Sequence, residues 1–274
     1  MKIKGKMSLS SRLWLDRQTH DPYVKRAHKE GYRSRAAYKL LEIEEKFKLI
    51  KKSKHIIDLG AAPGGWSQLL SQKSAEDTKI VAIDLLNFDE LPKVQQFIGD
   101  FEDKENQQKI IGALGQKADL IVSDMAPSTV GHAQTDHLRI MNLVTSAYDF
   151  ALNTLAPGGS FVAKIFMGGK EKQFFERVKR DFEKAYFFKP KSSRSVSVEI
   201  YIIGSKMILQ PVISSPIQRY AEKSEKVVSD TKSKPEYQSI YNTGTGSFPS
   251  KSSDSSTYNN RLQELPGCGE IEKD

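Results

Sequence analysis

The chain has 274 residues, of which 38% are hydrophobic and 28% are charged, and it carries a formal net charge of +8. This length fits one large domain or two small ones, and no apolar run reaches the roughly 18 residues that a membrane helix needs. Cys268 is the only cysteine, which excludes a disulfide framework and a cysteine-based metal site. We therefore expect no metal, no membrane contact and a reducing, cytoplasmic compartment.

The N-terminal part of the chain holds most of the positive charge. Residues 1–54 contain 16 Lys and Arg against 6 acidic residues, whereas residues 55–204 contain 17 against 19. Such a block attracts polyanions, and this favours contact with RNA or DNA over a solvated, disordered arm. The spacing of apolar residues predicts one helix in this basic extension, over residues 34–48, with Ser34 as its N-cap. Because the start has no long apolar core and no clear cleavage site, a mitochondrial address is the less favoured alternative.

Residues 55–204 alternate short β-branched or aromatic runs with longer amphipathic runs. This alternation predicts an α/β fold with a mostly parallel sheet covered by helices. Strands are predicted at residues 55–59, 79–85, 95–99, 118–124, 160–166, 185–189 and 198–204, and helices at 64–73, 103–114, 137–155 and 170–183. Only a short segment joins the last two strands, so they should form an antiparallel pair at one edge.

The remaining residues, 205–274, are rich in serine, glycine, asparagine and threonine and have almost no periodic apolar pattern. We expect most of this tail to be disordered, because such a composition cannot bury enough apolar surface to fold.

The stretch "LGAAPGGWSQ" follows the first predicted strand and resembles three kinds of ligand loop. A P-loop needs a lysine at the position of Trp66, because that charge holds the β- and γ-phosphates. The dinucleotide fingerprint needs a glycine at the position of Ala62, where backbone approaches the pyrophosphate. The fingerprint also needs an acid about 20 residues further on, and Asp84 supplies it. The match to the dinucleotide fingerprint is therefore partial.

S-adenosylmethionine carries no phosphate and needs neither of those features. Asp58, Asp84 and Asp100 lie at or just after three successive predicted strands, whose ends line one crevice in an open α/β sheet. Asp84 can bind ribose hydroxyls and Asp100 the adenine amino group. Each acid by itself is more often a cap or turn residue, and their shared position is what favours this donor over NAD.

Charged residues also interrupt the later strands. Asp124 ends the fourth strand, while Lys164 and Glu199 stand within apolar runs. A lysine in a buried strand is costly unless its amine has a partner. A lysine shielded from water or near another cation acts as a base near neutral pH, and Asp124 can orient it. The alternative is that Lys164 and Glu199 form a buried ion pair or lie on an exposed edge.

The motifs "RSRAAYKLLEI", "LGAAPGGWSQ", "SDMAP" and "LAPGGSFVAKIF" together resemble the FtsJ-like ribosomal RNA large-subunit ribose 2′-O-methyltransferases, the bacterial heat-shock methyltransferases or RlmE family. The resemblance covers residues 11–204. It implies a Rossmann-like class I S-adenosylmethionine-dependent methyltransferase fold, with a seven-stranded, mostly parallel sheet and one antiparallel edge strand. The family's Lys-Asp-Lys-Glu tetrad falls on Lys39, Asp124, Lys164 and Glu199, and its donor site on Gly64, Trp66, Asp84, Asp100 and Asp124.

The resemblance further implies the reaction and the partner. The methyl group would pass from S-adenosyl-L-methionine to the 2′-hydroxyl of a uridine in the aminoacyl-site loop of 23S rRNA, within the large (50S) ribosomal subunit. Lys164 would accept the hydroxyl proton, and the chain would act as a monomer without a metal. The alternatives are a 2′-O-methyltransferase of tRNA or other RNA, and a ribosome-assembly factor without catalysis. The tail is not part of the resemblance.

Overall fold

The computed structural model describes residues 19–127 and 130–208 of the chain. The expectations for the first 18 residues and for the tail from residue 209 onward concern positions outside these ranges. The last described strand continues to Met207, past the boundary at residue 204 that the sequence predicts.

A seven-stranded sheet forms the centre of the described chain. Its strands are β1 (His55–Leu59), β2 (Lys79–Asp84), β3 (Val94–Ile98), β4 (Ala118–Ser123), β5 (Leu155–Phe166), β6 (Phe182–Phe188) and β7 (Glu199–Met207). They are arranged in the order β3-β2-β1-β4-β5-β7-β6. The first five strands of this order pair in parallel, and β7 is antiparallel to both β5 and β6. The expected α/β fold is confirmed, with β7 as the reversed strand, one place in from the edge.

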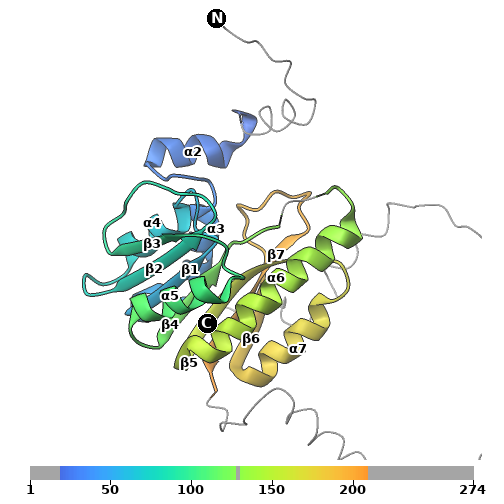
Figure 1. Cartoon of the computed structure of the whole chain (residues 1–274). Helices are drawn as coiled ribbons and strands as arrows, with labels where there is room; N and C mark the ends of the chain where they lie inside the picture. Colours follow the sequence, from blue (N-terminus) through green and yellow to red (C-terminus); the bar gives the residue numbers. More distant parts are fainter. Residues whose placement is uncertain (1–18, 128–129, 209–274) are drawn as a thin grey trace, which may run out of the picture. The chain divides into compact units, whose positions relative to one another are not determined.

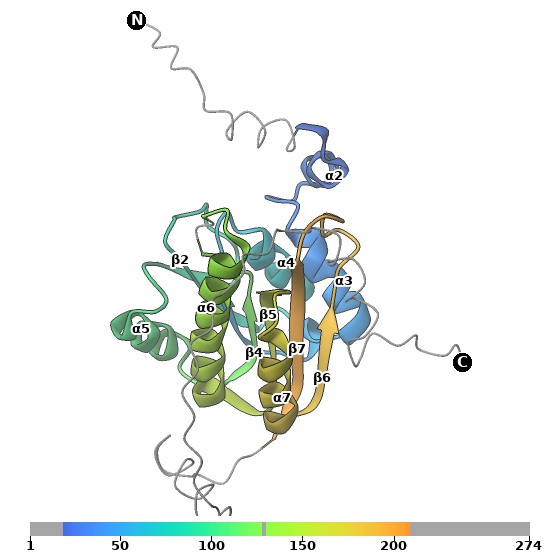
Figure 2. The same ribbon diagram turned by 90° about the vertical axis from the view of Figure 1, so that its right-hand side faces the viewer.

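Helices cover both faces of this sheet (Figures 1 and 2). They are α3 (Ala37–Phe47), α4 (Gly65–Lys73), α5 (Lys104–Leu114), α6 (Ala133–Thr154) and α7 (Glu171–Asp181), with a 3-10 turn, η1 (Ile50–Lys52). A further helix, α2 (Pro22–Glu30), precedes them and lies on neither face. α3 and α4 lie on one face, and α5, α6 and α7 lie on the other. The strand order reverses between β1 and β4, which is where open sheets of this kind form a ligand crevice.

Helix α3 is part of the main core, although it belongs to the basic N-terminal block. Its buried Leu40 and Ile43 cluster with residues of α4 and with the strands beneath. The block also contains a second helix, α2, that the sequence did not reveal. The prediction of Ser34 as a helix cap is wrong, because α3 begins at Ala37 and its cap residue, Ala36, offers no side-chain acceptor.

The opposite face is organised around Tyr148 of α6. Its ring lies 5.5 Å from that of Phe161 in β5 and 5.2 Å from that of Phe174 in α7, separations at which edge-on aromatic pairs attract. Its hydroxyl donates a 2.9 Å hydrogen bond to Asp181. These contacts hold α6 and α7 against the sheet.

Within the described ranges, no helix is long and apolar enough to cross a membrane.

Candidate active site

The loop after β1 lies against the segment after β4. Gly60 has a φ of 78°, which favours glycine because it has no Cβ. A Cβ at this position would come within 2.5 Å of the Met125 side chain. The amide of Asp124 donates to the Leu59 carbonyl at 3.2 Å. Glycine at residue 60 therefore allows the two strand ends to meet closely.

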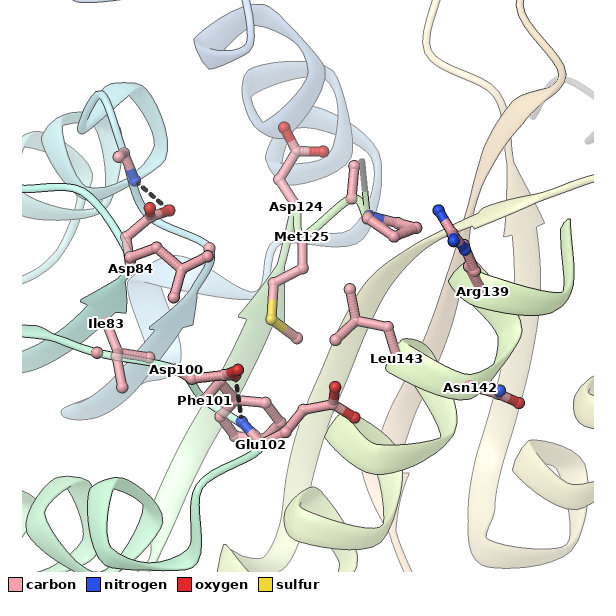
Figure 3. A pocket seen from close by; sticks show the side chains of 16 residues that line it. Ile83, Asp84, Asp100, Phe101, Glu102, Asp124, Met125, Arg139, Asn142 and Leu143 are labelled. Carbon is pink, nitrogen blue, oxygen red and sulfur yellow. Dashed lines mark hydrogen bonds between the residues drawn. The ribbon is translucent and has the colours of Figure 1, made fainter. Parts of the chain in front are cut away.

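A cavity of about 560 Å³ opens at these strand ends (Figure 3). Asp84 and Asp100 lie on one side of it, and residues of α6 such as Leu143 lie on the other. The full lining consists of Gly60, Ala62, Ile83, Asp84, Leu85, Gly99, Asp100, Phe101, Glu102, Asp124, Met125, Ala126, Pro127, Arg139, Asn142 and Leu143. Three of the residues predicted for the donor site, Asp84, Asp100 and Asp124, thus surround one cavity.

Two of these acids are held in place by backbone amides. Asp84 accepts 2.9 Å hydrogen bonds from the amides of Ala62 and Leu86. Asp100 accepts one of 2.9 Å from the amide of Glu102. A carboxylate has about four acceptor sites, so both acids keep acceptor capacity for a bound molecule.

Gly64 and Trp66 do not belong to the cavity lining. Trp66 is 2% exposed, and its indole nitrogen donates to the Ala36 carbonyl at 2.8 Å. A Cβ on Gly64 would come within 2.6 Å of the Arg33 guanidinium and 2.8 Å of the Phe88 ring. Both residues shape the loop and its packing, and a direct role in donor binding stays a prediction.

The expectation that Asp58 marks the donor pocket is wrong. Its side chain is fully buried and accepts a 2.6 Å hydrogen bond from the Ser67 hydroxyl of α4. Asp58 shares a strand face with Ile56, since alternate residues point the same way, and this face is covered by α3 and α4. Burial, opposed by the Ser67 hydrogen bond and supported by Asp124 and Asp84, raises the pKa of Asp58 to about 7.

The predicted catalytic lysine meets the predicted acid. Lys164 of β5 has a side chain that is only 8% exposed, and its Nζ lies 3.1 Å from a carboxylate oxygen of Asp124. The same Nζ donates a 2.6 Å hydrogen bond to the Asp124 backbone carbonyl. The pairing arises because β4 and β5 are parallel neighbours, so residues at their carboxyl ends lie side by side.

A second ion pair joins α3 to the start of β7. Lys39 Nζ lies 2.7 Å from Glu199 Oε1, and both side chains are 12% exposed. Lys164 and Glu199 therefore each have another partner, and the alternative that they pair with each other is wrong. All four residues of the predicted tetrad are mostly buried and lie in two ion pairs.

Tyr201 links the two ion pairs, and sequence reasoning missed it. Its hydroxyl donates a 2.6 Å hydrogen bond to Asp124, and Lys39 Nζ lies 5.8 Å from the centre of its ring. Tyr201 is directly opposite Lys164 in the β5–β7 register, so their side chains emerge on the same face. The signal in the sequence was the spacing of two residues from Glu199, which places both on one face of a strand.

The cluster makes Asp124 a stable anion. Burial by itself would raise its pKa, but the charges of Lys164 and Lys39 and the Tyr201 hydroxyl outweigh burial and hold the pKa of Asp124 below its usual range. Burial and the nearby Asp124 and Glu199 raise the pKa of the Tyr201 phenol well above its ordinary value, so Tyr201 stays a hydrogen-bond donor. This arrangement can hold an amine in a fixed orientation beside the cavity that Asp124 also lines.

No group of three or more His, Cys, Asp or Glu side chains within residues 19–127 and 130–208 is placed to hold an ion. The polar groups at the cavity are acids and backbone amides, together with Arg139 and Asn142 of α6.

Comparison with known proteins gives consistent results. The model of the FtsJ-like methyltransferases matches residues 32–207. The chain is 49% identical over 209 residues to a protein of Rickettsia bellii named ribosomal RNA large subunit methyltransferase E, covering 74% of this chain and 92% of that one. It is 52% identical over 204 residues to the Zymomonas mobilis protein of the same name, with the same coverage.

A solved structure supports the same grouping. A ribosomal RNA methyltransferase from Plasmodium falciparum superposes with a TM-score of 0.59 at 29% identity, covering 65% of this chain and all of that one.

Proposed function

Because the chain belongs to the FtsJ-like methyltransferase family, we propose that it transfers a methyl group from S-adenosylmethionine to the 2′-hydroxyl of a uridine in the aminoacyl-site loop of 23S rRNA, within the 50S subunit. The observation that carries this proposal is the position of Asp124. One residue both lines the cavity and holds the buried Lys164 amine. This position supports Lys164 as the proton acceptor beside a site for the methyl donor.

The cavity suits S-adenosylmethionine because its residues match the parts of that molecule. Asp84 has free acceptor positions for ribose hydroxyls, and Asp100 has them for the adenine amino group. Leu85 and Leu143 supply apolar surface of the kind that lines cofactor sites. The methionine part would lie near Asp124 and the glycine loop, where Gly64 and Trp66 set the course of the backbone.

The chemistry on the protein side is proton transfer and precise alignment. The donor supplies an electrophilic methyl group on a sulfonium, whose positive charge is lost on transfer. Lys164, paired with Asp124 as an ammonium in the free protein, first gives up a proton to solvent. Its amine then accepts the proton of the 2′-hydroxyl as the oxygen attacks, and Asp124 stabilises the ammonium that re-forms. Lys39 and Glu199, held together at 2.7 Å, position the ribose. Alignment of the reacting atoms provides much of the acceleration.

The basic N-terminal block is proposed as the part that binds the RNA backbone, with residues 55–204 as the methyltransferase domain. Arg35 and Arg194 lie close together, because both form ion pairs with Asp21, the N-cap of α2. The loop that carries Arg194 leads into Glu199. We further propose that the chain acts as a monomer in the cytoplasm.

The test is a map of ribose methylation in a strain that lacks this chain. We expect one uridine of the aminoacyl-site loop of 23S rRNA to lose its 2′-O-methyl group, seen as the loss of a primer-extension stop at low nucleotide concentration. Complementation with the wild-type chain should restore the stop. An unchanged 23S rRNA together with a lost modification in tRNA would reassign the substrate, and unchanged RNA of both kinds would favour an assembly factor.

A further inference from the structure

The segment that leads into α3 is attached to the helix that follows the glycine loop. The Gln68 side chain accepts a 2.9 Å hydrogen bond from the Arg33 amide and donates one of 2.7 Å to the Gly31 carbonyl. The Trp66 indole donates to the carbonyl of Ala36. Three hydrogen bonds therefore fix to α4 the backbone that directly precedes Lys39.

From this segment the Arg33 side chain reaches the loop that follows β2. One guanidinium nitrogen donates a 2.6 Å hydrogen bond to the Asp89 carbonyl, and the other donates one of 3.0 Å to the Glu90 carbonyl. The guanidinium carbon lies 5.6 Å from the centre of the Phe88 ring. A planar guanidinium with two parallel donors suits this pair of successive carbonyls, and an ammonium group does not.

The two carbonyls belong to the loop of residues 85–91, whose first residue reaches the donor cavity. This loop begins directly after Asp84, and Leu85 lines the cavity. Leu85 and Leu86 are 67% and 68% exposed, so the start of the loop is held by little apolar burial of its own. The two guanidinium hydrogen bonds of Arg33, called here the Arg33 fork, therefore tie this loop to the segment before α3.

Arg33 also lies directly over the glycine loop. Its guanidinium would be only 2.6 Å from a Cβ at Gly64, so the absence of a side chain at residue 64 makes room for the Arg33 fork. The Arg33 guanidinium thus bonds the backbone of a loop more than 50 residues away, whereas the Arg26 charge pairs with Glu30 within α2 itself.

We propose that Arg33 is a positioning residue that fixes the 85–91 loop for donor binding and thereby couples the donor cavity to the segment that carries Lys39. The inference deepens the proposed function and rests on it, since the donor is taken to be S-adenosylmethionine. Coupling of this kind is reciprocal: donor binding orders the segment that precedes Lys39, and fixing that segment strengthens donor binding.

The experiment measures S-adenosylmethionine binding to the full chain by calorimetry, without RNA. Arg33→Ala should weaken binding about tenfold, as expected when hydrogen bonds from a charged donor are lost. Arg33→Lys should not restore the affinity, because one ammonium cannot replace the fork. Arg26→Ala is the matched control, because it removes the same charge from the same basic block and should leave the affinity unchanged.

Kinetics separate positioning from a general loss of folded protein. Arg33→Ala should raise KM for the donor while kcat at saturating donor stays near wild type, whereas partial unfolding would lower kcat at constant KM. Wild-type affinity in Arg33→Ala, or equal losses in Arg33→Ala and Arg26→Ala, would overturn the inference. Failure of the wild-type chain to bind the donor would instead overturn the proposed function, and the inference with it.

Discussion

Two buried carboxylates at the ends of the adjacent strands β1 and β4 have opposite electrostatic surroundings. Asp58 has a serine hydroxyl as its side-chain partner, and burial raises its pKa to about 7. Asp124 is mostly buried as well, but Lys164, Lys39 and Tyr201 hold its pKa below the usual range. The comparison teaches that position at the crevice does not decide the role of an acid. The charges that face the acid decide whether its carboxyl group is held as an anion.

The two acids also differ in how their partners are collected. Asp58 and Ser67 are nine residues apart along one motif, whereas Tyr201 reaches Asp124 from 77 residues away. The first pair joins β1 to α4 across the glycine loop. The second cluster exists only when α3, β5 and β7 are all folded into place. Variants of Asp58 and variants in the Asp124 cluster should therefore differ in how much activity and stability they lose.

The largest effect is expected for Lys164→Ala. Removing a general base typically costs about 10²–10⁴-fold in rate, so methyl transfer should fall by that much. The affinity for S-adenosylmethionine should survive, because Lys164 does not line the cavity. Transfer of labelled methyl groups and donor calorimetry measure the two quantities separately. Normal turnover in this variant would exclude Lys164 as the proton acceptor.

A smaller loss is expected for Lys39→Ala. This change leaves Glu199 without its partner at 2.7 Å, and displacement of a reacting group by about 1 Å can cost on the order of 10²-fold. The transfer rate should therefore fall by about one to two orders of magnitude. Lys109→Ala, on the exposed surface of α5 and outside the basic N-terminal block, is the control and should keep its activity. Equal rates for the two variants would remove Lys39 from the site.

Tyr201→Phe tests the link between the two ion pairs. The variant keeps the ring and removes the hydroxyl that donates to Asp124, a bond to a charged group worth about 1.5–3 kcal/mol. Because the folded pKa of Asp124 is depressed, its contribution to stability is complete above the ordinary range of aspartate and is lost as pH falls through the folded pKa.

Loss of the Tyr201 hydroxyl should move this loss of stability to higher pH. The measurement is the free energy of unfolding in urea, determined from neutral to acid pH. Tyr186→Phe, in the edge strand β6, is the control and should follow the wild-type profile. A Tyr201→Phe profile that coincides with wild type would show that the hydroxyl does not stabilise the Asp124 anion.

The smallest effect on activity and a distinct effect on stability are expected for Asp58→Asn. A raised folded pKa contributes stability that is complete below the ordinary range of aspartate and is lost as pH rises through about 7. Relative to the variant, wild type should therefore lose unfolding free energy on the order of a few kcal/mol between pH 4 and pH 8. Parallel pH profiles for the two proteins would contradict the raised pKa of Asp58.

Much of the fold was predictable because its signals are local. Apolar runs and turns predicted all seven strands, and the short link between the last two predicted their antiparallel pairing. Helix α2 was missed because it is a short, polar helix with a single buried residue, Ala27. The core position of α3 was also missed. Its segment is rich in charged residues, whereas its burial depends only on the apolar residues along one face of the helix.

The site was predictable only in part, and for a related reason. Motifs at strand ends brought Asp84, Asp100 and Asp124 to one cavity, but the same reasoning wrongly placed Asp58 there, because a strand end does not say which face a side chain takes. Tyr201 was missed because an aromatic residue in an apolar strand looks like ordinary core. Its role depends on the register between β5 and β7, which no local pattern encodes.

The most direct test measures methyl transfer from labelled S-adenosylmethionine to 50S subunits and to naked 23S rRNA, both from a strain that lacks this chain, with wild-type protein and with Lys164→Ala. We predict label on one ribose 2′-oxygen of a uridine in the aminoacyl-site loop of the subunits and much less on naked rRNA. With Lys164→Ala, transfer should be about 10²–10⁴-fold slower under conditions where that variant still binds the donor. Label on a base, label on tRNA in its place, or full transfer by Lys164→Ala would contradict this prediction.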